Sequence, residues 1–257
     1  MHEVLNKKGF ICDMDGVIYH GNKILDGVKE FVNWMLENDK KFVFLTNSAE
    51  RTPHELSMKL QRMGLDVSAD HFYTSAMATA EFLSAQKPEC TAYVIGEAAL
   101  TKAMYDKRIY MNDINPDYVV LGETRSYNFE KLEKAIELVR KGAKLIGANP
   151  DTVGVTEKGI APATGALIAP IEISTGKKAY FVGKPNPLML RHGLKLIGCH
   201  SADIAFIGDR MDTDIIAGIE SNVDTVLVLS GVTSKEDISL FPYRPKYVLG
   251  GVGDLLK

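Results

Sequence analysis

The sequence predicts an α/β protein built on a parallel sheet. Apolar, strand-like segments alternate with helix-like segments along most of the 257 residues, which is the pattern of strands joined by crossover helices. The first apolar run, residues 10–12, leads directly into two acids, Asp13 and Asp15. Because ligands of such sheets bind beyond the carboxyl ends of the strands, we expect these acids to face a ligand.

The other elements follow in order from this first strand. Apolar residues recur at helical spacing between Val28 and Leu36, and residues 41–45 are predicted to form a second buried strand. Thr52 and Pro53 are typical of a helix start, and Glu55 can complete a capping box. Further strands are predicted at 71–74, 92–95, 118–121, 144–146, 180–182, 204–207 and 225–229, with helices at 129–141 and 187–197.

Composition excludes several classes of protein. The chain is 46% apolar and 25% charged, with a formal net charge of -3, so a basic face for a nucleic-acid polymer is not expected. Its longest apolar stretches are strand-sized, which predicts neither a membrane span nor a signal peptide. The chain has three cysteines and no Cys-x-x-Cys pair among them: Cys12, Cys90 and Cys199. This argues against a disulfide framework or a thiolate zinc site and favours a cytoplasmic location. The oligomeric state stays open, a homo-oligomer included.

The middle of the chain, residues 81–178, is predicted to be a separate module because it lacks the strand-end acids described here. Residues 1–80 and 179–257 would then form the other domain, in line with about 150 residues per domain. Residues 149–165 are rich in Gly, Pro, Thr and Asp and are predicted to form a loop. Loops of that length are usually functional or disordered, and we interpret this one as facing a substrate.

Two later strand ends also carry charged residues. The strand at 204–207 is followed by Asp209, Asp212 and Asp214, and carboxylates so placed can ligate a hard cation such as Mg2+. The segment lacks the central Gly and the later Glu of a calcium-binding loop. Lys184 follows the strand at 180–182 and can neutralise a phosphate or an anionic nucleophile. The alternatives are that Asp212 caps a helix and that the lysine is solvated surface.

These strand ends resemble, in chain order, the four motifs of the haloacid dehalogenase-like phosphohydrolase superfamily. The motifs are Asp13 to Val17, Thr46-Asn47, Lys184, and Gly208-Asp209 followed by Asp214. Five further stretches resemble the NagD-type branch, in which an α/β cap is inserted between the second and third motifs: residues 73–80, 122–128, 149–151, 182–185 and 229–232. The resemblance implies a Rossmann-like core, with the strands bearing Asp13, Thr46 and Asp209 side by side, and an α/β cap at 81–178.

The resemblance also implies a Mg2+-dependent phosphatase. Asp13 would attack phosphorus and form an aspartyl-phosphate, while Asp15 would protonate the leaving oxygen and later activate water. A side-chain oxygen of Asp13, the main-chain carbonyl of Asp15 and the carboxylate of Asp209 would hold Mg2+.

Phosphate binding would fall to Thr46, Asn47 and Lys184, and Asp214 would orient the metal site or the lysine. The physical need for these groups is independent of the resemblance. A phosphate dianion repels a carboxylate nucleophile, by about 4 kcal/mol for two unit charges 4 Å apart at an effective dielectric constant near 20. Mg2+ and Lys184 must offset that repulsion.

Selectivity for the substrate must come from the module outside the core. Arg125, Asn149, Asp151 and Thr164 are candidate substrate-binding residues from their position in the chain, and each can equally be structural; Arg125 can recognise a second anionic group. The resemblance implies a small phosphorylated metabolite such as a nucleoside monophosphate or a sugar phosphate. Phosphatases of glycolate phosphate and pyridoxal phosphate share this cap type.

Three other functions are alternatives. A haloalkanoate dehalogenase also uses a strand-end aspartate but needs neither Mg2+ nor a second acid, so Asp15 and Asp209 count against it. A phosphotransferase or phosphomutase would share every catalytic residue. A non-catalytic binding protein would keep the fold without the chemistry, and the complete set of motifs argues against it.

Overall fold

The computed structural model describes residues 2–156 and 159–257. Contacts within the chain divide it into two compact units. The first unit consists of Met1–Thr46, Pro53–Tyr73 and Lys184–Lys257, and the second of Asn47–Thr52 and Thr74–Gly183. The chain therefore passes between the units at four peptide bonds. The sequence predicts a cap domain at residues 81–178. Because a cap is defined by its function and the two units by contacts, the predicted bounds of the cap stay a prediction.

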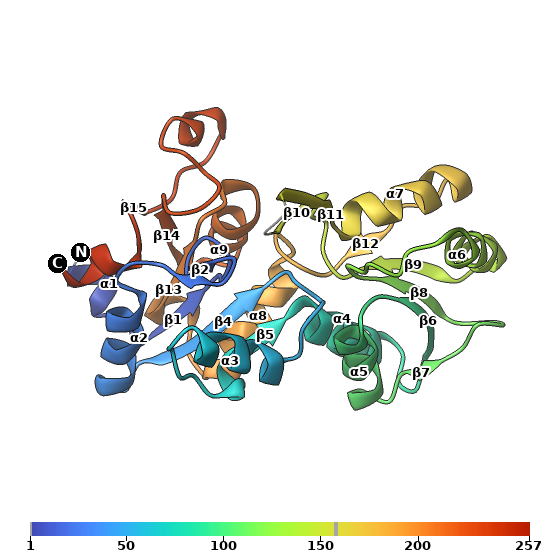
Figure 1. The fold of residues 1–257 in the computed structure, drawn as a ribbon, viewed down its shortest axis with the longest axis horizontal. Coiled ribbons are helices and arrows are strands. Elements are labelled where there is room, and N and C mark those ends of the chain that lie inside the picture. Colours follow the sequence, from blue (N-terminus) through green and yellow to red (C-terminus); the bar gives the residue numbers. More distant parts are fainter. Residues whose placement is uncertain (1, 157–158) are drawn as a thin grey trace. The chain divides into compact units, whose positions relative to one another are not determined.

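The first unit contains a six-stranded sheet in the order β15-β14-β13-β1-β4-β5 (Figure 1). The neighbouring pairs from β15 to β4 are parallel. In β1, Cys12 pairs with Ile207 of β13 and with Phe44 of β4, which confirms that the strands leading to Asp13, Thr46 and Asp209 lie side by side. The strands are β1 Gly9–Cys12, β4 Lys41–Thr46, β5 Phe72–Thr74, β13 Ile204–Gly208, β14 Asp224–Val228 and β15 Tyr247–Leu249.

Helices cover both faces of this sheet because its strands are apolar on both sides. Phe10 packs edge-on against Phe31 of α2, with ring centroids 5.5 Å apart. Ile11 and Leu45 point to the opposite face, where they approach Gly193 of α8. The helices are α1 His2–Leu5, α2 Val28–Glu37, α3 Pro53–Arg62, α8 Pro187–Ile197 and α9 Ile216–Glu220, and a short hairpin pairs β2 Tyr19–His20 with β3 Lys23–Ile24. This arrangement is the expected Rossmann-like core.

The second unit contains a five-stranded sheet in the order β12-β9-β8-β6-β7, with all neighbouring pairs parallel. Its strands are β6 Thr91–Ile95, β7 Tyr110–Met111, β8 Tyr118–Leu121, β9 Lys144–Gly147 and β12 Tyr180–Phe181. The helices are α4 Ser75–Gln86, α5 Ala98–Asp106, α6 Phe129–Lys141 and α7 Thr164–Thr175. Ile95, Leu121, Leu138 and Ile168 belong to one buried core between the sheet and helices α6 and α7 (Figure 1). The inserted module is therefore α/β, as expected.

The prediction of a loop over residues 149–165 is wrong in part. Strands β10 Val153–Thr156 and β11 Gly159–Pro162 pair there as an antiparallel ribbon, with Val153 opposite Pro162. Residues 157–158 of the predicted loop lie outside the described residues. The β-branched residues Val153 and Ile160 favour extended backbone, and this preference outweighs the surrounding turn-forming residues.

No helix among residues 2–156 and 159–257 combines the length and the apolar character that a membrane crossing requires. All three cysteines are free, and Cys12 and Cys90 are buried.

Candidate active site

Asp13 follows β1, a central strand of the first unit, and its backbone is hydrogen-bonded to the neighbouring strand β13. Its backbone N–H donates to the carbonyl of Ile207 in β13 at 2.8 Å, so the end of β1 has a fixed direction. The residue is only 8% exposed, and its side-chain Oδ1 accepts a hydrogen bond from Lys184. A carboxylate held in this way is a candidate nucleophile.

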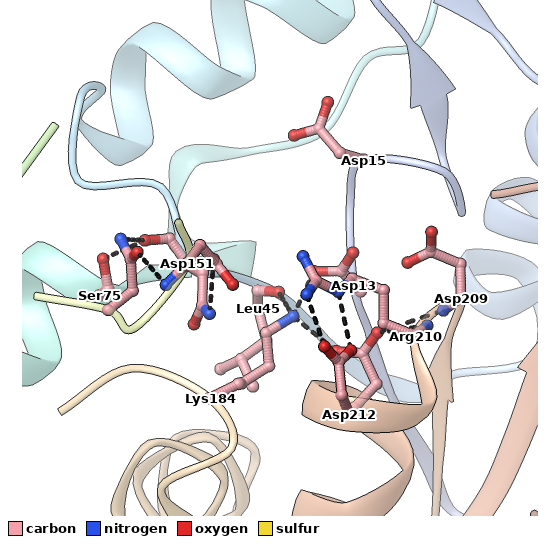
Figure 2. Close-up of polar contacts among 12 residues, drawn as sticks. Asp13, Asp15, Leu45, Ser75, Asp151, Lys184, Asp209, Arg210 and Asp212 are labelled. Atoms are coloured by element: carbon pink, nitrogen blue, oxygen red, sulfur yellow. Dashed lines mark hydrogen bonds and ion pairs between the residues drawn. The ribbon is translucent and has the colours of Figure 1, made fainter. Parts of the chain in front are cut away.

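Lys184 joins three elements of the first unit at a buried point (Figure 2). Its Nζ donates to Asp13, to Asp214 Oδ1 at 2.8 Å and to the carbonyl of Leu45 at 3.3 Å. Burial lowers the pKa of Lys184, but the two carboxylates raise it by more, so the net shift of the pKa is upward. The lysine is therefore a cation at neutral pH.

Asp209 lies at the end of β13 and is 1% exposed. Its Oδ2 accepts from the backbone N–H of Val232 at 2.7 Å. Its Oδ1 is buried and has no hydrogen-bond partner among the described residues. A buried carboxylate oxygen without a donor is costly unless a cation faces it, so this atom is suited to a metal ion.

Two glycines allow the chain to approach Asp209 closely. A Cβ atom at Gly231 would lie 2.0 Å from Asp209 Oδ2, and one at Gly16 would lie 2.5 Å from the same oxygen. Gly16 also has a φ of 82°, which favours glycine. Larger residues at either position would displace the carboxylate.

Asp214 supports both the lysine and the turn that carries Asp209. It lies in a π-helical turn, Met211–Ile215, and its Oδ2 accepts from the backbone N–H groups of Asp209 at 3.2 Å and Arg210 at 3.1 Å. Since Oδ1 accepts from Lys184, both oxygens of Asp214 already have donors. Asp212, by contrast, pairs with Arg210 in a more exposed position (Figure 2).

The three buried carboxylates of Asp13, Asp209 and Asp214 are close enough to share one cation. Each offers an oxygen within 4.8 Å of the others. Burial, followed by the negative charge of Asp214, raises the pKa of Asp209 to about 7. Burial is also the largest cause of the raised pKa of Asp13, against the opposing effect of Lys184. When all three carboxylates are ionised, one ammonium leaves an excess of negative charge, and this oxygen-only donor set fits Mg2+.

Asp15 and Thr46 complete the predicted residues of the first unit. Asp15 is exposed, and its Oδ2 accepts from the Tyr19 hydroxyl at 3.2 Å. Figure 2 shows its carboxylate pointing away from Asp13 and Lys184. Thr46 is buried at the end of β4, the strand that pairs with β1.

Asn47 follows Thr46 in sequence but belongs to the second unit. Its Nδ2 donates to Asp151 Oδ2 at 2.9 Å. Its carbonyl accepts from Asn149 Nδ2 at 2.7 Å and also from the Ser75 hydroxyl. Two of the predicted substrate-binding residues, Asn149 and Asp151, therefore contact the segment that follows β4.

The other two substrate-binding candidates lie elsewhere in the second unit. Arg125 is exposed, and its backbone N–H donates to Glu97 at 3.1 Å. Thr164 is the first residue of α7 and is fully buried, and its hydroxyl has no partner within the described parts of the chain. A role for either residue in substrate binding stays a prediction.

Glu123 is not among the residues predicted from the sequence. It accepts from Asn149 Nδ2 at 2.6 Å and from the backbone N–H of Ala49 at 3.1 Å. An acid two residues after the predicted strand at 118–121 is the same kind of signal that identified Asp13. The Tyr19 hydroxyl and the N–H of Val232, which donate to Asp15 and Asp209, have no such signal, because neither donor is an acid at the end of a predicted strand.

Family models match most of the chain. A model described as haloacid dehalogenase-like hydrolase matches residues 10–108, and a second, HAD-hydrolase-like model matches residues 181–255. The dihydroxyacetone phosphatase of Corynebacterium glutamicum is 44% identical, over 96% of this chain and 90% of that protein. The ribonucleotide monophosphatase NagD of Escherichia coli is 42% identical, over 96% of this chain and 98% of that protein.

Solved structures agree with these matches. NagD from Escherichia coli has a TM-score of 0.92 at 42% identity, covering 97% of this chain and 98% of that one. A 4-nitrophenylphosphatase from Thermotoga maritima has a TM-score of 0.94 at 34% identity, covering 99% and 98%. The chain therefore belongs to the haloacid dehalogenase-like hydrolase family, in its NagD-like phosphatase branch, and is a phosphoric monoester hydrolase.

Proposed function

We propose that this protein is a Mg2+-dependent phosphatase that hydrolyses small phosphate monoesters through an aspartyl-phosphate on Asp13. The observation that carries the proposal is the buried cluster in which Lys184 bridges Asp13 and Asp214, beside the Asp209 oxygen that has no hydrogen-bond partner in the described chain. Burying so many like charges is unfavourable for folding alone. Their persistence at one strand edge is explained by a reaction that uses them.

In this mechanism the Asp13 carboxylate attacks phosphorus as the bond between phosphorus and the ester oxygen breaks. Asp15 gives a proton to the leaving oxygen; its carboxylate, which is exposed and points away from Asp13 in the structure, turns toward the ester oxygen for this step. Asp15 then takes a proton from the water that hydrolyses the aspartyl-phosphate. The two steps return Asp13 as a free carboxylate and release inorganic phosphate.

The remaining residues bind and orient. Thr46, Asn47 and Lys184 bind phosphoryl oxygens, and Asp214 keeps Lys184 pointed at Asp13. The residues that would hold Mg2+ are Asp13 and Asp209 through their carboxylates and Asp15 through its main-chain carbonyl. The ion would supply positive charge that offsets the repulsion between the phosphate dianion and these carboxylates.

The substrate class is proposed from the relatives. Their names include dihydroxyacetone phosphatase, ribonucleotide monophosphatase and, at 35% identity in Staphylococcus saprophyticus, acid sugar phosphatase. A small phosphorylated metabolite, either a nucleoside monophosphate or a sugar phosphate, is therefore the proposed partner, with residues 81–178 acting as the cap that selects it. The free, scattered cysteines support the proposed cytoplasmic location.

The test compares Asp13→Asn with Asp212→Asn, a matched change of an acid whose side chain pairs with Arg210 at the protein surface. We expect Asp13→Asn to lower kcat roughly 10³-fold or more on p-nitrophenyl phosphate with Mg2+. Asp212→Asn should stay within about twofold of the wild type, because Asp212 lies outside the buried cluster.

Unchanged turnover in folded Asp13→Asn would end the nucleophile assignment. Wild-type activity that survives EDTA would end the proposed metal dependence. A panel of nucleoside monophosphates and sugar phosphates, assayed with and without an added alcohol, then identifies the substrate and separates hydrolysis from phosphoryl transfer.

A further inference from the structure

A second, partly buried network contacts the segment that follows β4, and it contains an acid to which the mechanism gives no role. We name Asn47, Glu123, Asn149 and Asp151 the amide cluster. Glu123 Oε1 accepts from Asn149 Nδ2 at 2.6 Å, and the same Nδ2 donates to the carbonyl of Asn47 at 2.7 Å. Glu123 Oε2 accepts from the backbone N–H of Ala49 at 3.1 Å. Glu123 thus contacts one end of the segment 47–49 directly and the other end through Asn149.

The sheet of the second unit explains why Glu123 and Asn149 meet. Strands β8 and β9 are parallel neighbours, and Leu121 pairs with Gly147. Glu123 and Asn149 each lie two residues beyond that pair, so continuing the register places them next to each other. Their contact is therefore built into the strand pairing, and Asn149 is fully buried there.

We propose that Glu123, acting with Asn149, is a positioning residue that holds the backbone of residues 47–49 in the conformation that binds the phosphoryl group. This inference rests on the proposed function, in which Thr46 and Asn47 bind phosphoryl oxygens. Fixing the Asn47 carbonyl and the Ala49 N–H leaves little freedom to the peptide groups between them. A pre-organised segment does not have to be ordered when substrate binds.

The charge of Glu123 fits this role. Both of its partners are donors, so the ionised carboxylate accepts two hydrogen bonds, one at each oxygen. A glutamine has one oxygen and one NH₂ group in the same place, so one donor would face another donor. A buried donor left in this way is costly.

Glu97 provides a matched control in the same unit. Its Oε1 accepts from the Thr124 hydroxyl at 2.9 Å and from the backbone N–H of Arg125 at 3.1 Å. It therefore also holds a loop by two hydrogen bonds, but it holds residues 124 and 125, which follow Glu123 in sequence, and not residues 47–49. Glu97→Gln should disturb local structure about as much as Glu123→Gln without changing residues 47–49.

The first readout is phosphate binding in the full-length protein with Mg2+. We expect Glu123→Gln to raise both KM for p-nitrophenyl phosphate and the inhibition constant of inorganic phosphate about tenfold, with kcat within about threefold of the wild type. Glu97→Gln should keep both constants within about twofold. If Glu123 had only a structural role, Glu123→Gln would lower the melting temperature but would not raise KM while leaving kcat nearly unchanged.

The second readout does not depend on activity. The Ala49 amide, followed by residue-resolved hydrogen exchange, should lose about tenfold protection in Glu123→Gln and none in Glu97→Gln. Wild-type constants together with wild-type Ala49 exchange in Glu123→Gln would overturn the inference. If Glu123→Gln does not fold, Asn149→Ala is judged by the same limits. If the wild type hydrolyses no phosphate ester, the proposed function fails, while the exchange rate still decides whether Glu123 orders the segment.

Discussion

Two polar clusters of this molecule differ in how their hydrogen bonds are completed. In the charged cluster of the first unit, made of Asp13, Lys184, Asp209 and Asp214, the lysine pairs with Asp13 and Asp214, and a buried oxygen of the third carboxylate, Asp209, has no donor in the described chain. In the amide cluster of the second unit, donors and acceptors alternate.

This difference distinguishes a cluster suited to catalysis from a cluster suited to holding the backbone in one conformation. The side-chain nitrogen of Asn149 serves both Glu123 and the Asn47 carbonyl, and its Oδ1 accepts from the N–H of Asp151 at 3.1 Å. A satisfied network of this kind stabilises one conformation. An incomplete network keeps electrostatic capacity for a ligand, at a cost to folding. The charged cluster should therefore respond far more strongly to a change of charge than the amide cluster.

The largest effect is expected for Lys184→Met. This change leaves Asp13 and Asp214 as buried carboxylates without their counter-ion, so kcat/KM for p-nitrophenyl phosphate should fall roughly 10³-fold or more. Lys246→Met is the control, because Lys246 also bridges two acids, Glu3 and Asp224, but is more exposed. Activity of Lys184→Met within tenfold of the wild type would show that the buried lysine is structural.

The next effect tests the close approach at Asp209. The Cβ of Gly231→Ala would overlap Asp209 Oδ2, so the carboxylate must move, and we expect Mg2+ affinity to fall about 10- to 100-fold. Calorimetric titration with Mg2+ measures it. Gly251→Ala, which places a Cβ where no atom lies within 4 Å, should bind Mg2+ like the wild type. Equal Mg2+ affinities for the two variants would show that Asp209 is not a ligand of the metal ion.

A third prediction concerns pH. Burial and the neighbouring Asp214 raise the pKa of Asp209 to about 7, and a metal ligand must lose its proton to bind. As pH falls below about 7, protons compete with Mg2+, so the apparent Kd for Mg2+ should rise about tenfold or more between pH 8 and pH 6. Above pH 8 this dependence should level off. A Kd that is constant from pH 8 to pH 6 would contradict the raised pKa.

The same shift predicts the sign of a stability change. The folded metal-free protein holds a proton on Asp209 between about pH 4 and pH 7, where the unfolded chain, with a pKa of about 3.9, has lost it. This group therefore makes the free energy of unfolding decrease as pH rises from 4 to 7. Urea unfolding in EDTA should show a steeper decrease for the wild type than for Asp209→Asn, which cannot titrate there. Parallel curves would exclude Asp209 as the source.

The smallest effect is expected in the amide cluster. In the wild type, Asn47 Nδ2 donates to Asp151 Oδ2 at 2.9 Å. Asp151→Asn removes a charge but keeps an oxygen that can accept this hydrogen bond. We expect KM to rise by no more than about fivefold, since a neutral hydrogen bond contributes about 1 kcal/mol. Steady-state kinetics on p-nitrophenyl phosphate provide the measurement. A loss of 100-fold in kcat would mean that Asp151 touches the reacting group, a larger role than the substrate-binding one predicted from the sequence.

Local signals predicted the elements whose ends are encoded by a few adjacent residues. Helix α6 runs from Phe129 to Lys141 as predicted, because the Asn128 side chain accepts from the backbone N–H of Lys131 at 3.0 Å and caps it. Helix α8 also has its predicted bounds, since Asn186 caps it and Pro187 begins it. Strand β8 matches residue for residue.

Other elements had no local signal to read. Helix α4 buries small residues such as Ala76, Ala78 and Ala80, so it lacks the apolar stripe by which an amphipathic helix is recognised. Helix α7 is apolar around most of its surface and includes Pro170. Both were absent from the predicted helices because neighbouring packing, rather than periodicity, stabilises them.

By itself, the sequence determined which side chains stand at strand ends, because apolar runs followed by Asp13, Lys184 or Asp209 are local patterns along the chain. Only the tertiary structure decided which of them meet. Lys184 bonds Asp13 across 171 positions of sequence, and Asn47 joins the second unit although its neighbour Thr46 belongs to the first. The physical reason is the distance along the sequence over which each effect acts. Helix propensity and capping act over a few residues, whereas contacts such as that of Glu123 with Ala49 depend on the order and register of strands far apart in the sequence.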